Sequence, residues 1–422
     1  MLRSYFGHDA LEVRLAADEF AERDLADYPE AAREVTEMAT KHSIDANEAR
    51  DGVLLYRTGS DWKADLIVTS RGWLLAERSR PHSRLLASVF SPGEALAIVG
   101  LYLRWRQQPV IIGGTATAWH PTSMRRSAAY AATPAFERWN RAGRAWYDAE
   151  GDLTMETLNK TLLTRISRSF QFRDSVFALS TTMANHEPEE MLCEMDSLLF
   201  SLVGAFDVAA RITDRVLHLN GGTRAGWQNI QTGGWQSRLE PVAKALFDQT
   251  KRETEVQNTF EVLRALRNSV HNEALDLTRA DGSFYITIEP KTQDKLRGFL
   301  RKRHPGWNTA NLGVKVLPSG GVTQGAWLPG VGRHGVTVRR AGASLPTDPL
   351  DGTLVLDARS VVNKIFPASL IALNTIMKHL PLANLPGHSA NVENPTEANL
   401  PWQFSGTTAH RLRMLYGVTE LE

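Results

Sequence analysis

Apolar residues recur at helical spacing through the middle of the chain and predict long helices there. After Pro188 an apolar stripe continues for about thirty residues and ends at Asn220, which two glycines follow as is typical of a helix C-terminus. The segment FEVLRALRNSVHNEALDL, at 260–277, carries one apolar face made by Phe260, Leu263, Leu266 and Val270. Residues 151–282 are therefore predicted to form a helical bundle.

The period of the pattern changes to two between residues 283 and 357 and predicts a β-rich insert. The runs that alternate in this way are SFYITIEP, LGVKVLP, GVTVRR and GTLVLDA, and Gly and Pro separate them. Helical spacing returns at 358–382, which is predicted to pack back on the bundle. The Asn- and Pro-rich tail at 383–422 is expected to be mostly loop.

Residues 1–150 show short runs of both kinds and predict an N-terminal α+β domain with a sensor or regulatory role. Three β-type runs are expected at 53–57, 64–70 and 72–77. Ser91-Pro92-Gly93-Glu94 has the form of a capping box with Pro at the first helical position. The fold class is thus α+β, mainly helical.

Composition indicates an ordinary soluble globular protein, with 42% hydrophobic and 23% charged residues. The net charge of +1 predicts no overall attraction to nucleic acid or membranes, so such binding must come from local patches. The one cysteine, Cys193, excludes an internal disulfide and is expected in the core, in a reducing compartment. Without an apolar leader or a run of the roughly eighteen residues that span a bilayer, a cytoplasmic protein with no membrane partner is expected.

Several common catalytic motifs lack part of their context. The glycines of GVGRHG, at 330–335, precede a strand instead of opening a helix, which favours a hairpin loop over nucleotide binding. Asp65 and Glu77 lie on adjacent expected strands, but the lysine of a restriction-type nuclease is missing after Glu77. No metal and no cofactor are expected.

Two stretches are locally basic. Residues 101–175 contain eleven Lys or Arg and six Asp or Glu among several Trp and Tyr. Such a pattern could bind single-stranded nucleic acid. The favoured interpretation is that the aromatic residues are core and the arginines are solvated. Residues 291–307 predict a basic amphipathic helix after a strand. Its candidate RNA-binding residues are Lys295, Arg297, Arg301, Lys302 and Arg303.

A cationic and titratable group lies on the shoulder of the apolar face at 260–277. At about 100° per residue, Arg264, Arg267 and His271 fall within roughly 60° of one another, with Asn268 beside them. Histidine titrates near neutral pH and can transfer protons. Arginine can neutralise a phosphate, so the set suits RNA cleavage by 2′-hydroxyl attack without a metal.

The long helices and the motif Arg267-Asn268-x-x-His271 together resemble the HEPN superfamily of helical-bundle nucleotide-binding domains and ribonucleases, over about a third of the chain. In that family four to six residues separate the arginine from the histidine. Here three residues separate Arg267 from His271, and six separate Arg264 from it, so either arginine could have the role. Arg267 is preferred because a polar residue, Asn268, follows it. Position 273 is Glu273, where toxins neutralised by adenylylation have a tyrosine.

The resemblance implies a homodimer that pairs two motifs in one cleft, RNA as substrate, and a context as a toxin or phage-defence effector with a regulatory protein or phage trigger. Two other hypotheses stay open. One is a non-catalytic HEPN module that binds RNA or a nucleotide, and the other is an unrelated helical regulator or scaffold.

Overall fold

A computed structural model describes residues 28, 30–61, 64, 66–78, 89–107, 110–111, 118–182, 188–222, 225–230, 233–251, 253–272, 276–280, 283–302, 304–317, 350, 353–388 and 406–417. The chain divides into two compact units. The first comprises Met1–Gln108 with Met414–Gly417, and the second comprises Pro109–Arg413 with Val418–Glu422.

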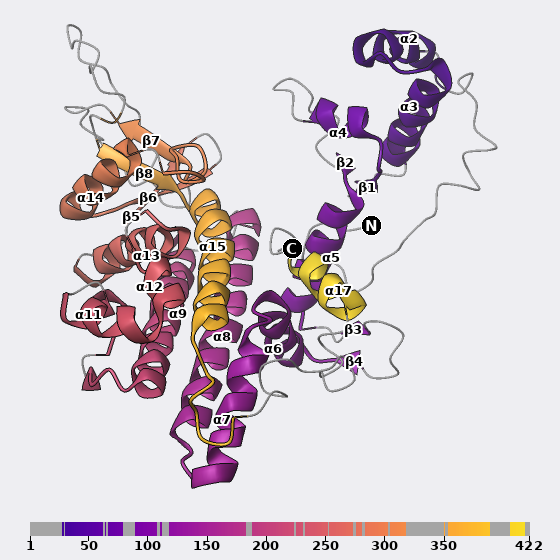
Figure 1. Ribbon diagram of the computed structural model, residues 1–422. Helices are drawn as coiled ribbons and strands as arrows, with labels where there is room; N and C mark the ends of the chain where they lie inside the picture. Colours follow the sequence, from indigo (N-terminus) through magenta and orange to yellow (C-terminus); the bar gives the residue numbers. More distant parts are fainter. Residues whose placement is uncertain are drawn as a thin grey trace, which may run out of the picture. The chain divides into compact units, whose positions relative to one another are not determined.

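The first unit is a small helical assembly with one pair of short strands (Figure 1). Its elements are α2 (Ala31–His42), α3 (Ala46–Asp61), β1 (Ile67–Val68), α4 (Gly72–Arg78), β2 (Val89–Phe90) and α5 (Pro92–Trp105). The two strands pair in parallel. Val35, Val53, Trp73 and Val89 belong to its buried core.

Two of the three strands expected in this region are wrong. Residues 53–57 lie inside α3, where Ala49 and Val53 are one helical turn apart and both buried. Residues 72–77 lie in α4, and only Ile67 and Val68 of the run at 64–70 are extended in a strand. These windows of five and six residues were too short for the period-two and helical patterns to be told apart.

The capping box at the start of α5 is confirmed. Ser91 Oγ accepts a hydrogen bond from the Glu94 backbone N–H, and Glu94 accepts one from the Ser91 backbone N–H. At its other end α5 contacts the last turn of α17 (Gly406–Tyr416), a helix in the region expected to be loop. Buried Arg104 donates to the Leu415 carbonyl at 2.7 Å and stacks 3.7 Å from the centre of the Tyr416 ring.

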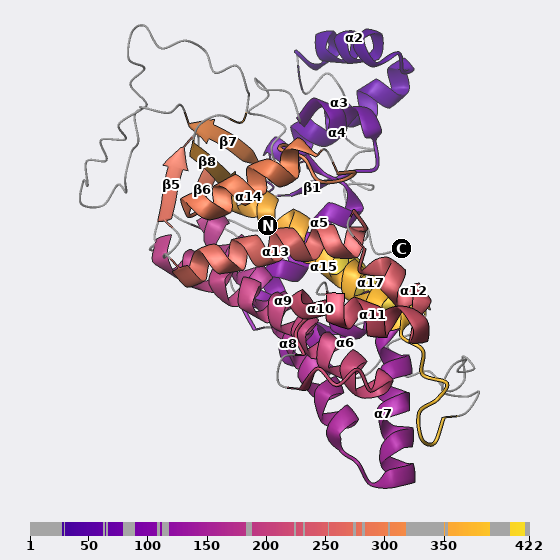
Figure 2. The ribbon, with the colours of Figure 1, turned by 60° about the vertical axis from the view of Figure 1, so that its left-hand side comes forward.

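The second unit is a helical bundle whose longest members, α8 and α9, run side by side (Figures 1 and 2). The bundle helices are α6 (Pro121–Ala132), α7 (Phe136–Glu150), α8 (Thr154–Thr182), α9 (Pro188–Leu217), α13 (Glu255–Asn272) and α15 (Ala358–His379). Ring contacts join them in the core: Phe170 of α8 lies 4.8 Å from Phe366 of α15. The returning helix at 358–382 is thus observed as α15.

Helices α6 and α7 belong to this bundle, although the sequence analysis assigned them to the N-terminal domain. Trp139 of α7 is fully buried and donates from Nε1 to the Met377 carbonyl of α15 at 2.9 Å. Asn159 of α8 donates to the Trp139 carbonyl. The division into units near residue 108 therefore does not coincide with the expected boundary at 150.

Short helices lie between α9 and α13 in the described part of the chain. They are α10 (Trp227–Ile230), α11 (Gly233–Val242) and α12 (Lys244–Gln249). Pro241 cannot donate a backbone hydrogen bond, and Glu253 has a positive φ of 75°, so both positions interrupt a helix.

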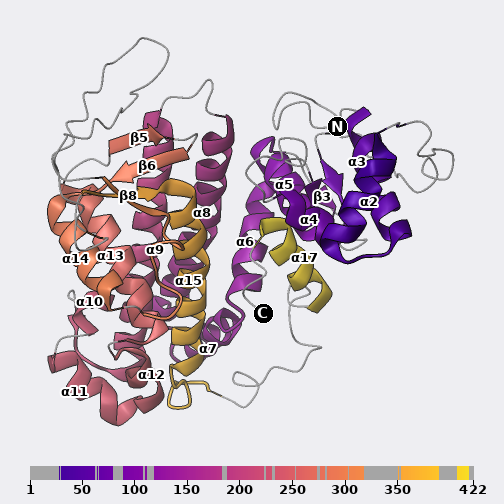
Figure 3. The ribbon, with the colours of Figure 1, turned by 90° about the horizontal axis from the view of Figure 1, so that it is seen from above.

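A four-stranded antiparallel sheet lies at one end of the bundle (Figure 3). Its strands are β5 (Asp276–Ala280), β6 (Ser283–Thr287), β7 (Val314–Leu317) and β8 (Thr353–Asp357), in the order β5-β6-β8-β7. Helix α14 (Pro290–Arg301) follows β6, and a two-stranded ribbon of β3 (Val110–Ile111) and β4 (Ala118–Trp119) precedes α6. Three of the four alternating runs are confirmed as strands, while GVTVRR and GVGRHG lie outside the described residues.

Two sequence-based expectations about burial have different outcomes. Cys193 is exposed, because it stands about 100° from Leu192 on α9 and so lies off the apolar stripe. Helix α15 is long and apolar enough to span a bilayer, but 61% of its most apolar window is buried. Most of α15 is thus covered by the bundle.

Candidate functional site

Helix α13 carries the candidate arginine-histidine motif and packs along α9. Phe260, Leu263 and Leu266 are buried, as their helical spacing predicts. The Phe260 ring lies 5.3 Å from that of Phe206, and the Arg267 guanidinium lies 5.1 Å from the centre of the Phe200 ring. The two helices are therefore antiparallel, since later positions on α13 meet earlier positions on α9.

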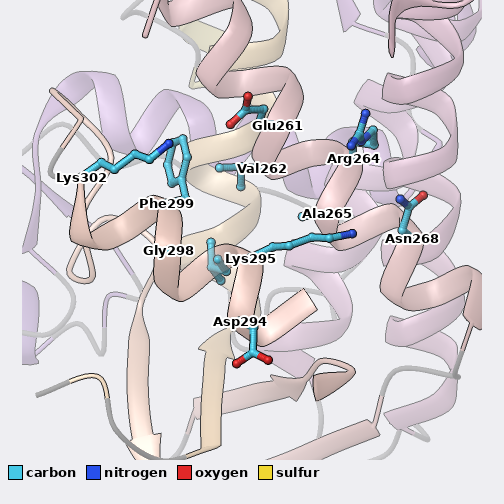
Figure 4. Close-up of a pocket in the computed structure, with 11 residues that line it drawn as sticks. Glu261, Val262, Arg264, Ala265, Asn268, Asp294, Lys295, Gly298, Phe299 and Lys302 are labelled. Carbon is cyan, nitrogen blue, oxygen red and sulfur yellow. The ribbon is translucent and has the colours of Figure 1, made fainter. Parts of the chain in front are cut away.

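A groove of about 400 Å³ lies between α13 and α14 (Figure 4). Its floor is apolar and contains the buried side chains of Val262, Leu296 and Phe299. Its polar rim consists of Glu261, Arg264 and Asn268 from α13 and Asp294, Lys295 and Lys302 from α14 and its C-cap.

Two of the three cations of the groove, Arg264 and Lys295, lie on one side of it, and Lys302 lies on the other beside Phe299. In Figure 4 the Lys295 side chain extends toward Arg264 and Asn268. Neither Arg264 nor Lys295 forms a hydrogen bond or ion pair with the part of the chain that the structure describes. Two unpaired cations above an apolar floor make an environment that favours an anion.

The two acidic residues of the rim are held elsewhere. Asp294 accepts from Arg297 at 2.6 Å, and Glu261 accepts from Gln257 at 3.1 Å. Neither carboxylate forms an ion pair with Arg264 or Lys295 among the described residues.

Buried hydrogen bonds fix α14 against α13. The Glu289 backbone N–H donates to Ser269 Oγ at 2.8 Å, and Thr292 Oγ1 donates to Glu289 Oε1 at 2.9 Å. Gln293 connects the same turn to the sheet, because its Oε1 accepts from the Leu354 backbone N–H at 3.0 Å. These polar residues join helix to helix, and their uneven spacing carried no signal in the sequence.

The two candidate arginines diverge. Arg264 lines the α13–α14 groove, whereas Arg267 lies over Phe200 of α9 and donates to Asn268 Oδ1 at 3.2 Å. The Asn268 amide nitrogen remains a donor on the groove side. The structure brings Asn268 and Arg264 to one groove, while Arg267, preferred from the sequence, contacts α9.

His271 stands in the last turn of α13. By helical pitch its position lies between the directions of Arg264 and Arg267, about 20° from the former and 40° from the latter. The side chain of His271 lies outside the described residues, as do Arg303 and Glu273.

The basic stretch at 291–307 contributes unevenly. Lys295 and Lys302 line the groove and Arg301 is exposed. Arg297 is instead a structural residue, because it donates to the Leu350 carbonyl at 2.9 Å and pairs with Asp294. The helix ends at Arg301, before Pro305. His304 is buried, with its ring centre 4.6 Å from that of Phe299, and so adds no charge to the surface.

In the other basic stretch, at 101–175, the expectation of core aromatics is confirmed only in part, since Tyr147 is 41% exposed and Trp105 is half-buried. Tyr102, Trp139 and Trp146 are buried. Three cations of this stretch lie together, because Lys160, Arg165 and Arg168 line one groove with Phe172 and Phe200. The signal in the sequence was their spacing of about one or two helical turns, which a count of charges overlooks.

Comparison with known proteins yields no relationship. No family model matches the chain, and neither a curated protein nor a solved structure matches it.

Proposed function

We propose that this chain is a metal-independent endoribonuclease of HEPN type, acting in the cytoplasm as a homodimer. The observation that carries the proposal is the α13–α14 groove, in which Arg264 and Asn268 lie beside Lys295 and no carboxylate pairs with either cation among the described residues. A phosphate is the anion that this donor set fits, since a guanidinium and an ammonium together offer several charged donors.

The chemistry assigns a step to each group. His271 removes the proton of a ribose 2′-hydroxyl, and the oxygen attacks the adjacent phosphorus. Arg264, with Lys295, stabilises the charge that develops on the phosphate, and Asn268 orients one of its oxygens. The bond to the 5′-oxygen breaks and a proton from the partner's His271 completes the leaving group, which leaves a 2′,3′-cyclic phosphate and a 5′-hydroxyl.

The first prediction is cleavage of labelled single-stranded RNA in the presence of EDTA, with 2′,3′-cyclic phosphate ends identified by mass spectrometry. His271→Ala is expected to lower the rate by roughly 10²- to 10⁴-fold, the usual contribution of a general base. Arg264→Ala is expected to cost about 10²-fold or more, and Arg267→Ala less, because Arg267 is turned toward Phe200.

The matched control is Arg144→Ala, which removes an exposed arginine of α7 far along the chain from the motif. Metal-dependent cleavage, or a His271→Ala variant as active as the parent, would contradict the proposal. If Arg144→Ala lowers the cleavage rate as much as Arg264→Ala does, the loss reflects the total positive charge of the protein and not a role of Arg264 at the site.

The second candidate function is a non-catalytic HEPN module that binds RNA. The engagement of Arg267 with Asn268 and Phe200 favours it, because a guanidinium held in this way is less able to reach a phosphate beside His271. RNA that binds and is recovered unchanged after long incubation supports this function. As a toxin or phage-defence effector, either form would act under a regulatory protein or phage trigger.

A further inference from the structure

A second groove, of about 520 Å³, follows the surface of α8 and α9. It is lined by Thr157, Lys160, Thr161, Thr164, Arg165, Arg168 and Phe172 of α8 and by Ser197, Phe200 and Ser201 of α9. Three of these described residues are cations and none is acidic. The stretch from Thr157 to Phe172 is about 22 Å long at 1.5 Å per residue, so the groove is elongated along α8.

The cations of this groove are available to a ligand. The guanidiniums of Arg165 and Arg168 form no hydrogen bond or ion pair with the described residues, and the Nε of Arg165 is buried. Gly204 makes room for Arg165, because a Cβ at that position would overlap its guanidinium. Lys160 pairs with Glu156 at 3.1 Å, and such an exposed pair exchanges partners at little cost.

Aromatic side chains accompany the cations. Phe200 is 39% exposed, and Phe172 also lines the groove. Arg267 lies over the Phe200 ring, so the groove adjoins the helix that carries the candidate motif. Arginine beside exposed aromatics binds single strands, whose unstacked bases can stack on the rings.

The hydroxyls of the groove can accept a hydrogen bond from a ribose. Thr161 and Thr164 donate their hydroxyl protons to the Thr157 and Lys160 carbonyls, at 2.9 and 2.7 Å. Ser201 donates to the Arg165 carbonyl at 2.8 Å. These oxygens can therefore only accept a further hydrogen bond, which a phosphate diester cannot donate and a ribose 2′-hydroxyl can.

From charge, aromatics and hydroxyls together, we infer that the α8–α9 groove binds single-stranded RNA, with phosphates on Arg165 and Arg168 and a base on Phe200. This inference deepens the proposed function and rests on it for the choice of RNA as the polyanion. The groove would hold the strand next to the scissile phosphate.

The test uses the full chain with His271→Ala, so that RNA is not cleaved during the measurement. Fluorescence anisotropy with a short labelled oligouridylate gives Kd at several salt concentrations. Arg165→Gln with Arg168→Gln is expected to weaken binding roughly tenfold or more. The dependence of log K on log salt is expected to become shallower by about 1.4, since each lost phosphate contact removes about 0.7.

Two further variants separate the parts of the site. Thr161→Val with Thr164→Val is expected to reduce the preference for oligouridylate over oligodeoxythymidylate without changing the salt dependence. Phe200→Leu is expected to weaken single-strand binding by about fivefold or more, because leucine fills space but offers no aromatic face. Arg144→Gln is the charge control, and circular dichroism melts verify that each variant is folded.

The outcomes distinguish this inference from the proposed function. Unchanged Kd in the Arg165/Arg168 variant, equal affinity for duplex RNA, or binding of polyglutamate in competition with oligouridylate at equal affinity overturns the groove as an RNA site. If EDTA-resistant cleavage persists while these variants bind normally, only the groove proposal fails. If no cleavage occurs but the groove variants bind RNA more weakly, the nuclease proposal fails and the groove is still supported as an RNA-binding site.

Discussion

Asp196 of α9 is an acidic side chain in an unfavourable environment. Burial raises its pKa from 3.8 to about 6, and Oδ1 is buried without a hydrogen bond to any residue that the structure describes. It stands one helical turn before Phe200, and continuing the antiparallel pairing of α9 with α13 brings the last turn of α13 to its level. An ionised carboxylate there costs folding free energy that a protonated one does not.

The pH dependence of stability follows from this shift. The folded state binds the Asp196 proton more tightly than the unfolded state, so the stabilising effect is complete below about pH 4 and is lost as the pH rises through about 6. Asp196→Asn is expected to raise Tm at pH 7 and to flatten the profile of Tm against pH between these values. Circular dichroism melts across this range measure both effects.

Asp248→Asn is the matched control for the Asp196 prediction. Asp248 is ion-paired with Lys251 at 2.7 Å, and hydrogen bonds from Lys251 and Lys244 lower its pKa, so it titrates below the window in which Asp196 does. An Asp196→Asn profile that runs parallel to the parent's between pH 4 and 6 would show that burial does not penalise this carboxylate.

Two glycines inside helices allow close approach, but against different neighbours. In α5, a Cβ at Gly100 would lie 2.5 Å from the Leu415 carbonyl oxygen, which is main chain. In α9, a Cβ at Gly204 would meet only the flexible end of Arg165. A backbone neighbour cannot move aside without displacing α17, whereas a side chain can adopt another rotamer.

Gly100→Ala is therefore expected to destabilise the first unit by about 1–3 kcal/mol, the usual cost of overpacking. Gly204→Ala is expected to leave Tm unchanged or slightly higher, because alanine favours a helix by about 1 kcal/mol over glycine. Thermal melts compare the two variants. Equal destabilisation in both would mean that Arg165 is fixed in place and cannot yield.

The pairing of α13 with α14 shows how far the candidate site followed from local sequence. Helical pitch grouped Arg264, Arg267 and His271 on one shoulder of a helix, with Asn268 beside them, and that grouping is a property of the helix alone. Which arginine faces the groove depends on the neighbours, α14 on one side and α9 on the other. The preference for Arg267 could not anticipate Phe200, which is distant in sequence.

The first unit contains chain from both ends of the sequence. Leu415 and Tyr416 are buried, and the Arg104 guanidinium donates a hydrogen bond to the Leu415 carbonyl. Removing this segment takes away a buried hydrogen bond from a charged donor, which contributes about 1.5–3 kcal/mol.

Ending the chain before Gly406 is therefore expected to loosen the first unit and leave the bundle intact. Hydrogen exchange should become faster in α5 and stay unchanged in α8 and α9, because local opening follows the loss of local contacts. A chain ended after Gly417 is the control, and Arg104→Met provides a second test if the truncated chain is insoluble. Slower exchange in α5, or a change confined to α8, would contradict the prediction.

The elements with strong local periodicity were predictable from the sequence. The apolar stripe of α9, the strands β6, β7 and β8, the helix α15 and the capping box of α5 all depend on residues within a few positions of one another. The windows at 53–57 and 72–77 were too short to distinguish a strand from a helix, and there the expectation was wrong.

Long-range packing decided the remaining features. The burial of Trp139 in the bundle, the joining of α17 to α5, and the placement of Lys295 and Arg264 on one groove each bring together residues from distant parts of the sequence. Local pattern specifies which face of a helix is apolar, but the neighbour that covers that face depends on the free energy of the whole packed unit. For this reason the helix that carries the motif was visible in the sequence, and the groove beside it was not.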